Sequence, residues 1–264
     1  MLSYKKYGQK PYRVIVLHGG PGAVGQAAPM ARTISKEMGV VEHLQLGHSI
    51  EDLKREIKEI IQKEALEEII LVGHSWGAWL AWIFAASYPK HVKKLVLISA
   101  GSFDEKYNRD LNEIRLKRLS PDLRKEAIKL MEKLMAARDD KIKPDWFRRF
   151  GELMERADSY HHEEDTKDEA IDFKPQQYLA LWPEAAGLRK SGELLKMAHH
   201  IICPVVAFHG AYDSHPAKGV EVPLKKRLTN FRFIKLEKCG HYPWKEKQAK
   251  EEFYWRLNDT LSRG

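Results

Sequence analysis

The chain has little cysteine: its 264 residues include only Cys203 and Cys239. Small secreted proteins that depend on disulfides are far richer in cysteine than this. Cys203 stands at the start of one predicted strand and Cys239 past the end of a neighbouring parallel strand. At about 3.3 Å per residue this separates them by roughly 20 Å, which is beyond disulfide reach. We expect two free thiols.

Long apolar runs are also lacking. No stretch reaches the roughly 18 apolar residues that a membrane-spanning helix needs. Residues 1–7 have neither the apolar segment nor the small-residue cleavage site of a secretory signal. With 43% hydrophobic and 31% charged residues, the composition is that of an ordinary globular protein. We therefore expect a soluble, cytoplasmic protein without a membrane partner.

The net charge is +8, but the basic residues are not clustered in one segment of the sequence. Basic and acidic side chains are interleaved on predicted helix faces, as in residues 51–63 and 245–252, which favours solvated helices over a nucleic-acid site. Histidine pairs at 161–162 and 199–200 lack the acidic or cysteine partners at metal-site spacing. We expect no nucleic-acid partner, no metal and no cofactor, and the sequence leaves the oligomeric state open.

Apolar runs typical of buried strands alternate with segments of helical spacing. The runs are nearly continuous in apolar residues, as in strands covered on both faces, which predicts an α/β fold with a mostly parallel sheet flanked by helices. A chain of this length can form one such domain with an insertion. The predicted strands are 12–17, 39–46, 69–72, 94–99, 205–210 and 231–236, and the predicted helices are 27–38, 49–65, 76–88 and 244–261.

The alternation stops between residues 102 and 201. That stretch is highly charged and has helical spacing, notably over 120–138 and 145–157. It predicts a helical lid inserted into a core formed by residues 1–101 and 202–264.

Aromatic residues of this lid are candidates for an apolar roof over a substrate pocket, since such a roof would exclude water. The candidates are Trp146, Phe147, Phe150 and Trp182.

Residues 73–77 read Gly-His-Ser-Trp-Gly and stand between a predicted strand and a predicted helix. This is the pattern of a nucleophile elbow, a sharp turn that holds a serine in a strained, exposed position where a base can reach it. The glycines at 73 and 77 would tolerate the close approach of the neighbouring backbone. Ser75 is the predicted nucleophile.

A serine nucleophile needs a histidine base and an acid that orients it. Asp213 follows the strand 205–210, and His241 follows the strand 231–236, in the chain order serine, acid, histidine. Loops after adjacent parallel strands lie side by side, so we expect His241 to take the serine proton while Asp213 fixes its tautomer. Asp104, after the strand 94–99, is an alternative acid.

The developing oxyanion requires backbone donors. Residues 18–22 read His-Gly-Gly-Pro-Gly, a glycine-rich loop that can turn an amide toward the substrate. We predict that the N–H groups of Gly20 and Trp76, the residue after the nucleophile, form the oxyanion hole.

Taken together, the chain resembles an α/β-hydrolase. Within that superfamily the His-Gly-Gly-Pro-Gly and Ser-Trp-Gly motifs resemble the proline iminopeptidase branch, which releases N-terminal residues from short peptides. The chain departs from that branch because no Asp-x-Arg-Gly-x-Gly segment follows the strand 39–46. The branch's leading hairpin is also shortened here, which predicts a trimmed sheet edge. Candidates for its amine-binding acids are Glu163, Glu164, Asp165 and Glu184.

The combined expectation is a serine hydrolase that forms an acyl-enzyme on Ser75. Its substrate would be a small molecule or short peptide with an ester or small amide bond, including N-terminal aminoacyl peptides by resemblance. Two alternatives stay open: a ligand receptor on the same fold that does not turn over, and a carbon–carbon bond hydrolase. A nucleophilic aspartate is disfavoured because position 75 is serine.

Overall fold

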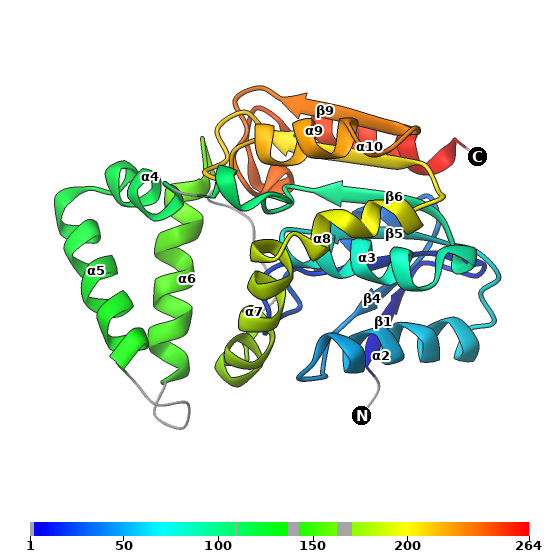
Figure 1. Ribbon diagram of the computed structural model, residues 1–264, viewed down its shortest axis with the longest axis horizontal. Coiled ribbons are helices and arrows are strands. Elements are labelled where there is room, and N and C mark those ends of the chain that lie inside the picture. The colour runs from blue at the N-terminus through cyan, green and yellow to red at the C-terminus, as the bar shows by residue number, and fades with distance from the viewer. Residues whose placement is uncertain (1–2, 109, 137–142, 163–170, 264) are drawn as a thin grey trace.

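The computed structural model describes residues 3–108, 110–136, 143–162 and 171–263. Seven strands form one sheet in the order β1-β4-β2-β5-β6-β8-β9, and every neighbouring pair is parallel except β1 with β4. The predicted α/β fold with a mostly parallel sheet is confirmed (Figure 1). The strands are β1 Tyr4–Tyr7, β2 Tyr12–Leu17, β4 Gly39–His43, β5 Ile69–His74, β6 Val92–Ile98, β8 Val205–Gly210 and β9 Phe231–Leu236.

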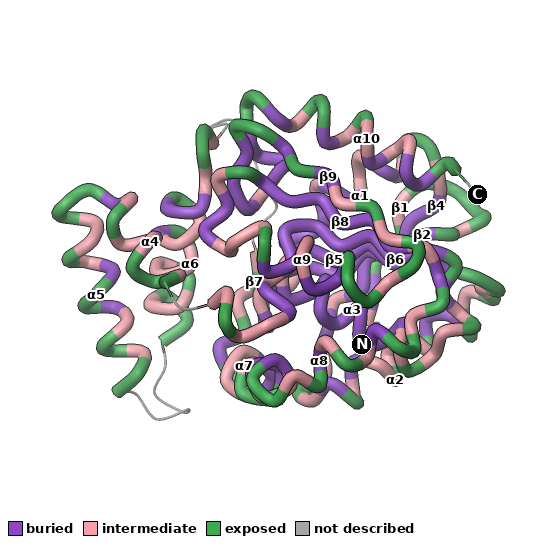
Figure 2. The backbone as a smooth tube through the Cα atoms, turned by 45° about the horizontal axis from the view of Figure 1, so that its top comes forward, coloured by how far each residue is buried: buried purple, intermediate pink, exposed green. Residues whose placement is uncertain are grey.

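Helices cover both faces of the sheet, and the strands are buried between them (Figure 2). Along β2, Ile15 and Leu17 join the core on one face, while Val14 and Val16 join the core on the other. Because successive side chains of a strand point to opposite faces, a continuous apolar run is what this arrangement requires. The covering helices are α1 Ala28–Ile34, α2 Ile50–Lys63, α3 Trp76–Ser87, α9 Lys218–Lys225 and α10 Lys250–Ser262.

At the edge of the sheet, the four-residue strand β1 pairs antiparallel with β4, Tyr4 opposite His43. This strand was not predicted from the sequence. The predicted last helix, 244–261, begins too early, because Pro243–Lys245 forms a 3₁₀ turn and α10 starts only at Lys250. Among the residues described, no helix is both long and apolar enough to cross a bilayer.

The helices between β6 and β8 are α4 Leu111–Arg118, α5 Pro121–Ala136, α6 Pro144–Asp158, α7 Pro175–Lys190 and α8 Glu193–Lys196. The helices α5 and α6 form a hairpin that projects from the body of the molecule, while α7 lies against it (Figure 1). A two-stranded antiparallel sheet joins β3 Ala23–Val24 to β7 Asp172–Phe173. The glycine-rich loop of residues 18–22 is thereby connected to the inserted segment.

The carboxylate of Glu246 explains why the last helix starts late. It is fully buried and accepts hydrogen bonds from the backbone N–H groups of Gly240 at 2.9 Å, Tyr160 at 2.8 Å and His161 at 2.7 Å. The chain must leave helical geometry around residue 246 for this side chain to point inward. One carboxylate therefore joins the segment after α6 to the loop after β9.

Replacement of Glu246 by Ala should destabilise the protein by about 3 kcal/mol or more, because three backbone N–H groups lose a charged acceptor and such hydrogen bonds contribute about 1.5–3 kcal/mol each. Urea unfolding measures the change. Glu252→Ala is the matched control, since it removes only an exposed carboxylate paired with Arg256, and should change the free energy of unfolding by less than about 0.5 kcal/mol. Equal effects of the two substitutions would contradict this account.

Candidate active site

Ser75 lies at the sharp turn between β5 and α3. Its backbone has φ 52° and ψ −116°, a conformation that residues other than glycine rarely adopt. A Cβ placed on Gly73 would lie 2.2 Å from the carbonyl oxygen of Gly77, and one on Gly77 would lie 2.4 Å from the carbonyl oxygens of Leu17 and His18. Glycine is therefore required at both positions, because a larger residue would clash with backbone atoms. The turn has the geometry predicted for a nucleophile elbow.

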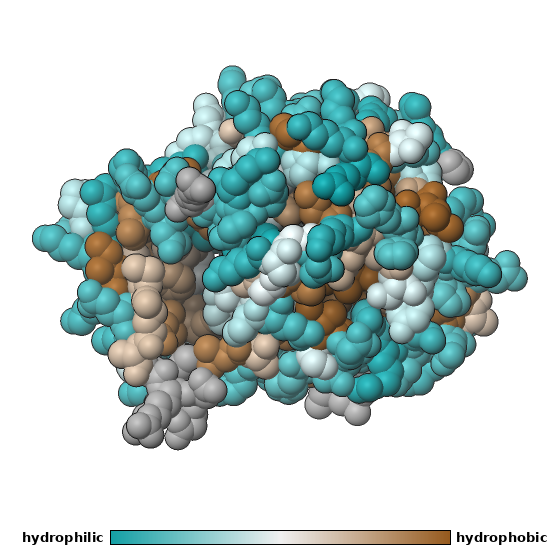
Figure 3. Space-filling view, in the orientation of Figure 1, coloured by the Kyte–Doolittle hydropathy of each residue, from teal (hydrophilic) through white to brown (hydrophobic). Residues whose placement is uncertain are grey.

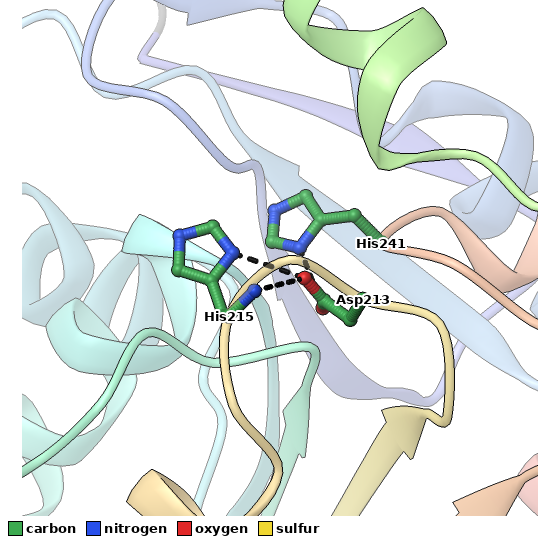
Figure 4. Close-up of side chains that lie close together, drawn as sticks. All are labelled: Asp213, His215 and His241. Atoms are coloured by element: carbon green, nitrogen blue, oxygen red, sulfur yellow. Dashed lines mark hydrogen bonds and ion pairs between the residues drawn. The ribbon is translucent and has the colours of Figure 1, made fainter. Parts of the chain in front are cut away.

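Asp213 and His241 lie on the loops after β8 and β9. The Nδ1–H of His241 donates to Oδ2 of Asp213 at 2.7 Å, and both side chains are buried (Figure 4). Burial disfavours the imidazolium, but the charge and hydrogen bond of Asp213 outweigh it and raise the pKa of His241 above the usual 6.5. Burial also acts against the carboxylate, yet the surrounding imidazoles, first that of His241, hold the pKa of Asp213 well below 3.8.

His215 also contacts this carboxylate, which sequence reasoning missed. Its backbone N–H donates to Oδ1 of Asp213 at 2.9 Å, and its ring Nδ1 lies 3.0 Å from the same oxygen (Figure 4). The His215 and His241 rings stack with centroids 4.6 Å apart. Burial, opposed by Asp213, lowers the pKa of His215 to about 4, so the ring is neutral and Nδ1–H donates. The only sequence signal was its place two residues after the predicted acid.

These three residues also form a cluster whose ligand atoms lie within 4.8 Å of one another, close enough to consider a metal ion. Their hydrogen bonds argue against that use. Both Nδ1 atoms already donate to Asp213, and the two rings are inclined by only 25°, so their remaining lone pairs do not converge on one point. The absence of a metal stays a prediction.

Two further histidines hold the loops from behind. The Nε2 of His74 lies 2.9 Å from the carbonyl oxygen of His241, and the Nε2 of His209 lies 2.8 Å from that of His215. Both rings are buried, and burial is the main reason that the pKa of His74 lies well below 6.5. The neutral ring of His74 donates to a backbone carbonyl and fixes one loop without adding charge to the site, and the contact of His209 fixes the other loop.

The glycine-rich loop approaches the elbow through the carbonyl oxygen of His18, to which a Cβ on Gly77 would come within 2.4 Å. Gly20 has φ 44° and its carbonyl oxygen accepts from Ala23 N–H at 3.1 Å. Trp76 is the first residue of α3, where an N–H has no partner within the helix. The Trp76 indole donates to Oε1 of Gln45 at 2.8 Å, and the Gln45 amide donates to the His18 carbonyl oxygen at 3.0 Å. The side chain of Gln45 thus connects the glycine-rich loop, which contains Gly20, to the first residue of α3, Trp76.

A small cavity of about 50 Å³ opens beside Ser75. Of the predicted pocket residues, Trp182 lines it. Arg189 and Asn108 also line it, and neither was predicted. Its described lining consists of Ser75, Trp76, Trp79, Gly101, Asn108, Leu111, Trp182, Arg189 and His215.

Four predicted residues do not line this cavity, and one of them, Phe147, contacts Tyr178 of α7 instead. Trp146 and Phe150 pack into the cluster inside the α4–α6 lobe, because they occupy the face of α6 that is turned to α5. Glu184 accepts a hydrogen bond from Ile50 N–H at 3.0 Å, where a carboxylate satisfies the N-terminus of α2. The other candidate acids, Glu163, Glu164 and Asp165, fall outside the described residues.

The alternative triad acid, Asp104, is bound to its own loop. Its side chain accepts from Lys106 N–H at 3.1 Å and pairs with the Lys106 ammonium at 2.9 Å. Asp213, in contrast, is bonded to His241 directly.

Comparison with known proteins gives a consistent result. Residues 12–248 match the family described as alpha/beta hydrolase fold. A proline iminopeptidase of Heyndrickxia coagulans is 25% identical to this chain, and the alignment covers 94% of this chain and 90% of that protein.

Two solved structures share the fold. The proline iminopeptidase of Mycobacterium smegmatis has a TM-score of 0.65 at 15% identity, covering 98% of this chain and 93% of that one. The monoacylglycerol lipase of Paleococcus ferrophilus has a TM-score of 0.62 at 17% identity, covering 98% and 97%. A peptidase and a lipase thus share this architecture, so the fold alone does not select the substrate.

The elbow geometry makes a prediction about Gly77. The substitution Gly77→Ala should lower the free energy of unfolding severely, because its methyl group would meet two backbone carbonyl oxygens. Gly187→Ala is the matched control: that glycine is inside α7 and a Cβ there meets nothing within 4 Å, so the helix should gain about 0.5–1 kcal/mol. Thermal unfolding of both variants measures this, and a Gly77→Ala variant as stable as the native protein would refute it.

Proposed function

The chain belongs to the α/β-hydrolase family, and from this premise we propose that it is a serine hydrolase whose Ser75 attacks the carbonyl carbon of an ester or small amide. The observation that carries the proposal is the buried 2.7 Å hydrogen bond between Asp213 and His241. A histidine oriented by a carboxylate on a loop beside a strained serine is the arrangement that activates an alcohol.

In the proposed reaction, Nε2 of His241 accepts the proton of Ser75 as the hydroxyl oxygen bonds to the substrate carbonyl carbon. The carbonyl electron pair moves to oxygen, where the N–H groups of Gly20 and Trp76 stabilise the negative charge. The imidazolium then gives its proton to the leaving alcohol or amine, and the carbonyl re-forms as an acyl-enzyme. Water, deprotonated by His241, releases the acid and restores Ser75. No step requires a cofactor.

We assign the core to residues 1–101 and 202–264 and the lid to residues 102–201. Support comes from Trp182, Arg189 and Leu111, which belong to the inserted segment and line the cavity beside Ser75. Closure of such a segment would exclude water from the acyl-enzyme until hydrolysis.

The substrate class is a small molecule or a short peptide. Similarity to proline iminopeptidases favours an N-terminal aminoacyl peptide. The cavity lining disfavours a cationic group, because its described residues include no carboxylate to bind an ammonium and do include the guanidinium of Arg189. Parallel assays of p-nitrophenyl esters and aminoacyl p-nitroanilides separate these substrates. The two buried cysteines are unpaired, which agrees with action in the reducing cytoplasm.

Replacement of Ser75 by Ala should abolish ester hydrolysis and leave folding intact. Mass spectrometry of the protein treated with a fluorophosphonate should show one adduct on the native chain and none on the variant. Hydrolysis of p-nitrophenyl acetate gives the second readout. A native protein that is neither labelled nor active would contradict the proposal and favour a ligand receptor.

The pH dependence should follow His241. The base works only when neutral, and its pKa is raised above 6.5, so kcat/KM should fall as the pH drops through an inflection above 6.5. Asp213 stays ionised and His215 stays neutral over that range, so neither adds an inflection. Asp213→Asn removes the charge that raises the pKa of His241 and should reduce kcat by about 10³-fold or more. An inflection well below 6.5 in the native enzyme would contradict this assignment.

A further inference from the structure

Five aromatic side chains form a continuous row. Trp79, on α3, stacks on Trp182 of α7 with ring centroids 6.0 Å apart and an interplanar angle of 11°. Trp182 in turn stacks on Tyr178 at 5.9 Å and 9°. Phe147 of α6 follows at 5.1 Å from Tyr178, and Phe173 of β7 lies 6.1 Å from Phe147. The row therefore joins residues from four separate elements.

One end of this row is at the proposed nucleophile. Trp79 and Trp182 line the same cavity as Ser75, so the row starts at the reacting serine and leads outward along α7. Tyr178 and Trp182 are four residues apart on that helix and thus share one face. In Figure 3, apolar surface lines the hollow between the lobe that α5 and α6 form, at the left, and the body of the molecule.

Core packing accounts only for the inner end of the row, because Trp79 belongs to the main core cluster and Trp182 packs against it. Tyr178, Phe147 and Phe173 belong to none of the core clusters among the described residues. Trp79 is buried, but Trp182, Tyr178, Phe147 and Phe173 each keep part of their surface accessible. The cluster within the α4–α6 lobe contains Trp146 and Phe150 without Phe147. Phe147 is thus turned away from its own helical lobe and toward α7. Burial also raises the pKa of Tyr178, as expected of a phenol in apolar surroundings.

We propose that the row of Trp79, Trp182, Tyr178, Phe147 and Phe173 is a substrate subsite that binds an extended apolar chain of the ester cleaved at Ser75. This inference rests on the proposed hydrolase function. The faces of partly exposed rings in sequence offer an apolar chain contact along its length. The row thereby makes chain length, rather than a polar group, the feature on which the enzyme selects.

A chain-length series tests the subsite. We expect kcat/KM for p-nitrophenyl esters from acetate to decanoate to rise roughly two- to fourfold per added methylene until the row is filled. Acetate esters of increasingly long alcohols form the second arm, because the chain could belong to either side of the ester bond. A rise in one arm supports the subsite, and a flat profile in both overturns it.

Substitutions in the row test whether the dependence on chain length comes from these side chains. In the arm that shows a rise, Tyr178→Ala and Phe147→Ala should each lower the ratio of kcat/KM for the longest chain to that for the shortest by about tenfold, and Tyr178→Phe should retain the native ratio. Trp255→Ala is the matched aromatic control, since Trp255 is 67% exposed on α10, and should leave the ratio unchanged. Equal losses for short and long chains would overturn the proposal.

The result is separable from the proposed function. A small methyl fluorophosphonate needs no chain-binding site, so its adduct on Ser75 reports the nucleophile alone. Labelling together with length-independent hydrolysis would reject the subsite and retain the hydrolase. Absence of labelling would reject the hydrolase itself. Thermal unfolding of every variant shows whether an altered ratio comes from a folded protein.

Discussion

The buried carboxylate of Asp213 is the constraint on which the rest of the site depends. A charge without solvent is tolerated only when donors surround it, and here two imidazoles and one backbone N–H supply them. These hydrogen bonds hold together the loops after β8 and β9, which carry Asp213 and His241. His74 and His209 complete the arrangement by binding the backbone of those loops from behind. The orientation of His241 is thus a consequence of the hydrogen bonds that stabilise one buried charge.

The parallel sheet brings these groups together. The strands β5, β8 and β9 end at the same edge, so the elbow and the two loops meet although Ser75 and His241 are far apart in the sequence. The inserted helices then cover that edge. Two roles are divided within α6: Trp146 and Phe150 hold the lobe together, while Phe147 faces α7 and extends the aromatic row. In the proposed subsite, one face of α6 holds the lobe together and another face offers Phe147 to the substrate.

The sheet and the elbow could be predicted from the sequence, since strands buried on both faces are continuous apolar runs and glycines mark the elbow. Features that depend on tertiary contacts could not be predicted. The late start of α10 depends on distant N–H groups that bind Glu246, and the role of Glu184 depends on the position of α2. His215 was missed because the turn that directs its ring to Asp213 has no periodic signature. Helical spacing predicted the lobe, but did not show which face of α6 meets α5.

The central claim is that Asp213 and His241 prepare Ser75 for attack at one edge of the sheet. A crystal structure of the protein after reaction with a fluorophosphonate tests it most directly. The account predicts phosphorus bonded to Oγ of Ser75, its oxygen within hydrogen-bond distance of the Gly20 and Trp76 N–H groups, and His241 still bonded to Asp213. An adduct on another residue, or a phosphoryl oxygen turned away from both N–H groups, would contradict it.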